Sequence, residues 1–141
     1  MYSAIDIAKY IVDYAVKKSS PVSNLKLQKI LYFLWIQYYK KTGENLFNDE
    51  FCAWQLGPVV PAAYYEFCSY AGTSIISNFD VELQKKDEDI VNSIIDQYLN
   101  KSASSLVNES HHHGGAWDEV FKNGQGNRAT IPFRLIIDLE C

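Results

Sequence analysis

Apolar residues recur every three or four positions near the start of the chain, which is the spacing of one face of a helix. Ser3 is placed to cap this helix, and Asp6 follows where a carboxylate favours the positive helix end. The lysine pair 17–18 and the Ser-Ser-Pro segment 19–21 end it. The residues that share its apolar face are Ala4, Ile5, Ala8, Ile11, Val12, Ala15 and Val16.

A second helix is predicted from Ser23 to about Thr42, with Gly43 as its natural stop. Leucine, isoleucine and aromatic residues cover most of its circumference. A helix this apolar is expected at the centre of the fold, surrounded by other elements. The narrow stripe that stays polar consists of Lys26, Lys29, Gln37 and Lys40.

Shorter segments complete the expected fold, which is of the α+β class and predominantly helical. About six helices surround the central apolar helix (residues 23–42), beside a small sheet of short strands. No linker or internal repeat interrupts the pattern, so we expect a single domain over residues 1–141. The sequence predicts strands at 50–54 and 73–76, a turn at 55–58, helices at 59–71, 87–99, 102–109 and 117–122, a flexible loop at 123–127 and a last helix after Ile131-Pro132.

The composition is that of an ordinary globular protein, with 48% hydrophobic and 21% charged residues. The formal net charge of −4 argues against a dedicated nucleic-acid binder, which normally shows a basic field. The charge is uneven: residues 1–49 carry +3 (seven Lys, four Asp or Glu), and residues 50–141 carry −7 (six Lys or Arg, thirteen Asp or Glu). Two patches of opposite sign suit a protein partner better than a polyphosphate.

The cysteines are Cys52, Cys68 and Cys141, an odd number without a C-x-x-C pair. They indicate free thiols in a reducing compartment, and we expect Cys52 and Cys68 to act as small hydrophobes among apolar neighbours. The N-terminal residues do not form a signal peptide, and no stretch approaches the roughly 20 apolar residues of a membrane span. We therefore expect a cytoplasmic protein without a membrane partner.

The run 111–113 of three histidines is the first candidate for chemistry. His111 and His113 could ligate zinc or another transition metal, because imidazoles two residues apart can reach one ion. No spaced Cys or His set supplies the third and fourth ligands, and a solvated loop is the alternative interpretation. A metal-dependent enzyme is therefore the lesser of the functional hypotheses.

No other catalytic pattern occurs in the chain. A G-x-S-x-G elbow, a phosphate-binding glycine loop and an H-E-x-x-H helix are all missing. The acidic run 87–89 is most simply a solvated helix start. We expect no catalytic residue, no enzymatic activity and no cofactor.

The first two helices and the turn between them could be mistaken for a DNA-binding helix-turn-helix. A recognition helix needs an exposed polar or basic face, and the second helix offers only its narrow lysine stripe. A DNA-binding or transcriptional regulator is therefore kept as the alternative to a protein-binding function.

Two segments resemble the signatures of a known family. Residues 24–32 (N-L-K-L-Q-K-I-L-Y) resemble the N-L-K-L-Q-K-L-L-Y signature of the Panacea-domain proteins, also called SocA-like or GepA-type antitoxins. Residues 51–59 (F-C-A-W-Q-L-G-P-V) resemble their A-W-x-x-G-P-V segment, and the resemblance extends over about residues 3–140. Ala116 departs from the family, in which a proline often precedes the late tryptophan. The weaker matches are Tyr64, Tyr65, His111, Trp117 and Ile131.

The resemblance implies a mainly helical antitoxin of a bacterial toxin–antitoxin system. Such proteins are commonly encoded beside toxins in prophages and mobile elements. They neutralise the toxins by binding them, and some deliver the toxin to a protease. A cognate toxin protein is thus the expected partner, with a protease or chaperone as a further candidate, and neither enzymatic activity nor a cofactor is implied.

The family motifs supply the candidate partner-contact residues. We expect Gln28 to be buried and bonded to the backbone of another segment, in particular the 54–58 turn, and Gly57 to take a positive φ. Phe33 falls within the polar stripe, so it is either covered by a neighbouring element, which we favour, or an exposed hot spot. The candidates are Lys26, Gln28, Lys29, Phe33, Trp54, Gly57, Pro58 and Trp117.

Overall fold

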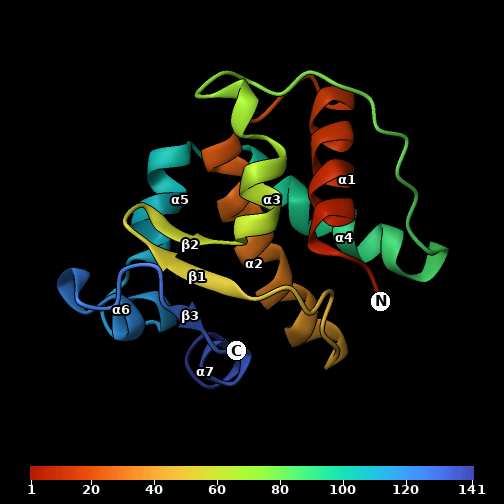
Figure 1. Cartoon of the computed structure of the whole chain (residues 1–141). Helices are drawn as coiled ribbons and strands as arrows, with labels where there is room; N and C mark the ends of the chain where they lie inside the picture. Colours follow the sequence, from red (N-terminus) through yellow and green to blue (C-terminus); the bar gives the residue numbers. More distant parts are fainter.

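The computed structural model describes the whole chain, residues 1–141. It contains seven α-helices and a small antiparallel sheet (Figure 1), which confirms the predominantly helical α+β class. The helices are α1 (Ala4–Lys17), α2 (Asn24–Thr42), α3 (Pro61–Glu66), α4 (Lys85–Leu99), α5 (Ala103–Ser110), α6 (Ala116–Phe121) and α7 (Phe133–Glu140). The strands are β1 (Phe51–Trp54), β2 (Gly57–Val59) and β3 (Thr130–Ile131), and single 3-10 turns follow α3 (Cys68–Tyr70) and α6 (Lys122–Gly124).

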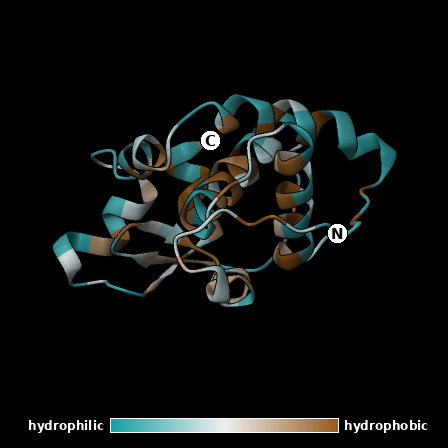
Figure 2. Ribbon diagram, turned by 90° about the horizontal axis from the view of Figure 1, so that it is seen from above, coloured by the Kyte–Doolittle hydropathy of each residue, from teal (hydrophilic) through white to brown (hydrophobic).

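The central position of α2 is confirmed. It contacts α1, α3, α4, α5, α7 and β2, and Figure 1 shows it passing through the middle of the molecule. The hydroxyl of Ser23 accepts a hydrogen bond from the Lys26 N–H at 3.3 Å, and Gly43 closes the helix in the left-handed conformation, at φ 72°. Apolar residues concentrate around this helix, whereas the outer surfaces of the surrounding elements are largely hydrophilic (Figure 2).

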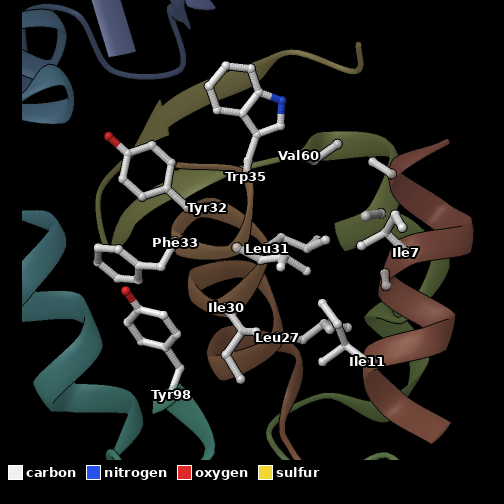
Figure 3. Close-up of a cluster of buried hydrophobic side chains, with 14 of the residues drawn as sticks. Ile7, Ile11, Leu27, Ile30, Leu31, Tyr32, Phe33, Trp35, Val60 and Tyr98 are labelled. Atoms are coloured by element: carbon white, nitrogen blue, oxygen red, sulfur yellow. The ribbon is translucent and has the colours of Figure 1, made fainter. Parts of the chain in front are cut away.

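The side chains of α2 pack against different neighbours on different sides (Figure 3). Leu27 and Leu31 lie toward Ile7 and Ile11 of α1, and Phe33 lies against Tyr98 of α4. The indole N–H of Trp35 donates to the carbonyl oxygen of Phe47 at 3.0 Å, so that even this large fully buried ring has its polar atom satisfied.

Helix α1 begins as its sequence predicts, because the Ser3 hydroxyl accepts from the Asp6 N–H at 3.1 Å. Its buried Asp13 accepts hydrogen bonds from the N–H groups of Phe79 and Val81, at 2.8 and 3.4 Å. These bonds hold the long connection between α3 and α4 against α1. None of the seven helices combines the length and the apolar composition that a membrane span requires.

The sheet has the order β2-β1-β3, with Trp54 paired to Gly57 and Phe51 paired to Ile131. The predicted strand at 73–76 is wrong: that segment is irregular, and its backbone bond to a distant part of the chain runs from the Ile75 N–H to the Val22 carbonyl oxygen at 2.8 Å. It has no neighbouring strand to pair with, and the third strand is β3.

The region after β1 also differs from its prediction. The chain turns at residues 55–56 and pairs again as β2, so the third helix starts at Pro61 and ends at Glu66. Cys68, expected among apolar neighbours, is exposed in the following 3-10 turn, while Cys52 is half-buried. Helix periodicity alone does not reveal that Val59 pairs with Cys52 in the sheet.

The sequence predicts that the acidic run 87–89 is a solvated helix start, and this holds for Glu88 and Asp89, which are exposed, but is wrong for Asp87. The helix begins at Lys85, and Asp87 in its first turn is buried, with 4% of its surface exposed. Its carboxylate accepts hydrogen bonds from the hydroxyls of Tyr2 and Tyr38, at 2.6 and 2.8 Å. Asp87 therefore joins α4 to α2 and to the N-terminal residues, and burial beside this carboxylate raises the pKa of both tyrosines.

Candidate functional site

Gln28 is fully buried on α2, as predicted, and both ends of its amide are bonded. Its oxygen accepts from the Val60 N–H at 3.1 Å, two residues beyond the predicted 54–58 turn. Its nitrogen donates to the Asn24 side chain at 3.1 Å, and Asn24 in turn donates to the Tyr64 carbonyl oxygen at 3.0 Å. This chain of bonds fixes α2 against the segment that leads from β2 into α3.

The sequence predicts that Lys29 lies in the polar stripe of α2, but the structure buries it. Its side chain is fully buried, and its ammonium nitrogen donates to the Pro58 carbonyl oxygen at 2.9 Å. Burial without an acidic partner lowers the pKa of Lys29 to about 7, because a charged ammonium is poorly solvated there. The stripe is covered at this point because β2 packs directly on α2.

Gly57 takes a positive φ of 116°, which confirms its prediction. A Cβ atom at this position would lie 2.7 Å from the Ser110 hydroxyl and 2.9 Å from Cε of Lys29. Both the backbone angle and the close approach thus require glycine. Gly57 and Pro58 are buried and form the joint at which β2 rests on α2 and α5.

Trp54 is half-buried at the end of β1 and is the centre of an aromatic cluster. Its ring meets those of Tyr64 and Tyr65 at centroid distances of 5.0 and 6.1 Å. The guanidinium group of Arg128 lies 4.5 Å from its ring centroid, a cation–π contact. Two backbone hydrogen bonds hold residues 128–129 beside β1: the Arg128 N–H donates to the Ala53 carbonyl oxygen at 2.6 Å, and the Ala53 N–H donates to the Ala129 carbonyl oxygen at 2.8 Å.

The segment 123–127, which its sequence predicts to be a flexible loop, is anchored at its end. The Gly126 N–H donates to the Phe121 carbonyl oxygen at 2.9 Å, and a Cβ on Gly126 would meet the Val120 carbonyl oxygen. Arg128, just beyond this segment, was not among the sequence-predicted site residues. No local pattern signals its contact with Trp54, which is far away in the sequence.

Trp117 of α6 bonds the start of the β1–β2 turn. Its indole N–H donates to the Trp54 carbonyl oxygen at 2.8 Å, and its ring stacks with those of His111 and Phe121 at centroid distances of 3.7 and 4.5 Å. Nε2 of His111 is buried and has no hydrogen-bond partner. Burial and the nearby charge of Lys29 lower the pKa of His111.

The side chains of the three histidines contact three different residues. His112 bonds the Glu140 carboxylate through Nε2 at 2.8 Å, and the exposed His113 lies 3.7 Å from Asp118. No group of three or more His, Cys, Asp or Glu side chains is arranged to hold a metal ion. Glu140 also accepts from the Tyr32 hydroxyl and the Ala116 N–H, at 3.3 and 3.0 Å, so it joins α7 to α2 and α6.

Lys26 and Phe33 lie away from the turn, on the side of α2 that faces α4. The ammonium nitrogen of Lys26 donates to the Leu99 carbonyl oxygen at 2.8 Å and so caps the end of α4, and partial burial lowers its pKa. Phe33 is 8% exposed and stacks on Tyr98 at 5.2 Å. This confirms the favoured interpretation, in which a neighbouring element covers Phe33.

A pocket of about 550 Å³ opens beside the β1–β2 turn. Its walls come from the start of α2, the 54–59 segment, α3, residues 71–72 and residues 127–128. Of the predicted site residues, Gln28, Lys29 and Trp54 line it, whereas Gly57, Pro58 and Trp117 support the turn from behind. The residues of both family-like motifs, distant in sequence, thus meet at one place.

The two motifs that meet at this site lie largely within a segment that matches a known protein family. The sequence profile of the family described as "Antitoxin SocA-like, Panacea domain" matches residues 27–118, and the chain belongs to this family. The chain is also 35% identical, over 143 aligned residues, to "Antitoxin SocA" of Caulobacter vibrioides (strain NA1000 / CB15N). The alignment covers 92% of the chain and 75% of that relative, and no solved structure matches the chain.

Proposed function

We propose that this protein is the antitoxin of a toxin–antitoxin pair and neutralises a cognate protein toxin in the cytoplasm by direct, non-catalytic binding. The observation that carries the proposal is the similarity of nearly the whole chain to Antitoxin SocA. The geometry supports it, because the family motifs build a firmly held turn beside an aromatic-walled pocket. Aromatic side chains in such places are common anchors of protein interfaces.

Two alternatives receive less support from the site. Residues 27–36 of α2 are all buried, so this helix offers no exposed face with which to read DNA. The imidazoles of the histidine run have separate partners in Trp117, Glu140 and Asp118, an arrangement that favours packing and ion pairing over metal ligation.

The direct test is co-expression with the neighbouring gene. The adjacent open reading frame is placed under an inducible promoter, with and without this chain, and growth is measured. We expect induction to stop growth, this chain to restore it, and the two proteins to copurify. A harmless neighbour, or rescue without any complex, would contradict neutralisation by binding.

Delivery of the bound toxin to a protease is a second element of the proposal. The half-life of the toxin after translation is stopped separates the two modes. Simple sequestration leaves the toxin stable in the complex, whereas an adaptor shortens its half-life only when this chain and the protease are both present.

A further inference from the structure

We propose that the pocket beside the β1–β2 turn is where the partner docks, and that it receives a short acidic segment of the toxin that carries an aromatic or large aliphatic side chain. This inference rests on the proposed antitoxin function and names the contact surface and the chemistry of its occupant. It follows from the exposed apolar residues, the charges and the rigidity of the pocket.

Two large apolar side chains stand exposed on this surface. Leu56, at the tip of the β1–β2 turn, is 54% exposed and lines the pocket. Tyr65 on α3 is 57% exposed and contacts both Trp54 and Tyr64. Trp54, Leu56 and Tyr64 line the pocket, and Tyr65 extends its aromatic surface outside the lining. These side chains suit an aromatic or aliphatic anchor from a partner.

The charge of the pocket is opposite to that of the chain. The protein has 17 Asp and Glu residues, yet none of them is among the fourteen residues that line this pocket. Arg128 is exposed at its edge and takes part in none of the four salt bridges, while the buried Lys29 forms part of its wall. A carboxylate from a partner would thus meet a guanidinium group that has no acidic partner, and no acidic side chain of the pocket would repel it.

The size and charge of the pocket favour a protein segment over a nucleic acid. A volume of about 550 Å³ holds a few side chains, and one exposed arginine can neutralise one carboxylate. Nucleic-acid binding rests on the neutralisation of several phosphates at once, and the net charge of −4 opposes it. An acidic peptide with one apolar anchor matches both properties.

The walls are also fixed before a partner arrives. The chain of bonds through Gln28 and Asn24 holds α2 to α3. Trp117 and Lys29 donate to one carbonyl oxygen of each strand that the turn joins, that of Trp54 in β1 and that of Pro58 in β2. A preorganised surface loses little conformational entropy on binding. The pocket can therefore hold a short segment without first being ordered by it.

The test uses the toxin identified by co-expression. Short overlapping peptides that cover its sequence are probed with the full chain, and the dissociation constant of the whole toxin is measured for variants. We expect the bound peptides to combine Asp or Glu with an aromatic residue or leucine. Leu56→Asp and Arg128→Glu should each weaken toxin binding about tenfold or more.

Matched controls lie on α7, which lines no part of the pocket. Leu139 is 41% exposed, and the Arg134 side chain is 82% exposed. Leu139→Asp and Arg134→Glu should bind the toxin like the parent, and all four variants should keep its thermal stability. Basic bound peptides, or pocket variants that bind with unchanged affinity, would overturn the inference while leaving the antitoxin function in place.

If the parent chain binds no toxin, the proposed function itself fails, and the pocket is tested alone. The blocked peptide Glu-Phe-Glu-Phe-Glu is titrated and backbone amide NMR shifts are followed, with Lys-Phe-Lys-Phe-Lys and oligothymidylate as comparisons. Shifts at residues 54–59 and 127–128 with the acidic peptide alone support the inference. No shifts, or equal shifts with the other two probes, overturn it.

Discussion

Replacing Lys29 by methionine should change how the stability of this protein depends on pH. Lys29 has an ordinary pKa of 10.5 in the unfolded chain and a pKa of about 7 in the folded protein, because it is buried without an acidic partner. Below pH 7 both states are protonated, and burial of the charge costs a constant amount. Between pH 7 and 10.5 the unfolded chain holds a proton that the folded protein lacks, so the free energy of unfolding rises with pH.

The size of this effect follows from the two pKa values. The full penalty, 3.5 pH units at about 1.4 kcal/mol each, is on the order of 5 kcal/mol at low pH. About 2 kcal/mol of it is relieved between pH 7 and pH 9. Lys29→Met removes the whole penalty but leaves the Pro58 carbonyl oxygen without its donor, which costs about 1–3 kcal/mol. The variant should therefore be at least as stable as the parent at pH 7.

The assay is urea unfolding of parent and variant at both pH values. Taking the difference between the two proteins cancels the other titrating groups. We expect the parent to gain about 2 kcal/mol on the variant between pH 7 and pH 9. Lys40→Met, on the exposed end of α2, should give a curve parallel to that of the parent. Parallel curves for Lys29→Met as well would refute the buried, unpaired ammonium.

Three further substitutions test the packing of α2 and its turn. Gln28→Leu should cost about 1–3 kcal/mol in urea unfolding by leaving the Val60 N–H unpaired; full stability would show that the bond is dispensable. Gly57→Val should lower the midpoint of thermal unfolding, because its Cβ collides with Ser110 and Lys29; an unchanged midpoint would contradict the close approach. Phe33→Ala should cost about 3–5 kcal/mol, and a stable variant that fails to neutralise the toxin would show a hot spot instead.

The parts of the fold that the sequence predicts correctly are those decided by local interactions. Ser3 and Ser23 cap their helices through N–H groups three residues away, and Gly43 ends α2 by its own backbone angle. The pairing of β3 with β1 joins residues about 80 positions apart, and its signal in the sequence is only a Thr-Ile pair before a proline. Such a contact cannot be predicted locally, because it depends on the path of all the residues that lie between the two strands.

The candidate site likewise has some features that the local sequence predicts and others that depend on distant contacts. The positive φ of Gly57 and the burial of Gln28 follow from their immediate sequence and from the apolar arc of α2. The burial of Lys29 does not, because helical spacing places it in a polar stripe and only the position of β2 covers it. The role of Arg128 could not be predicted either, because Arg128 lies in the turn before β3 and its contact, Trp54, is at the end of β1, far away in the sequence.

The three tryptophans of the chain differ in a way that makes one of them an optical reporter. Trp35 is fully buried and Trp117 is 6% exposed, whereas Trp54 is half-buried in the wall of the pocket, beneath the Arg128 guanidinium. A dissolved quencher such as acrylamide reaches an indole only where solvent does, so it should dim Trp54 selectively. Any molecule that fills the pocket should shield that ring and shift its emission to the blue, without a label or a substitution.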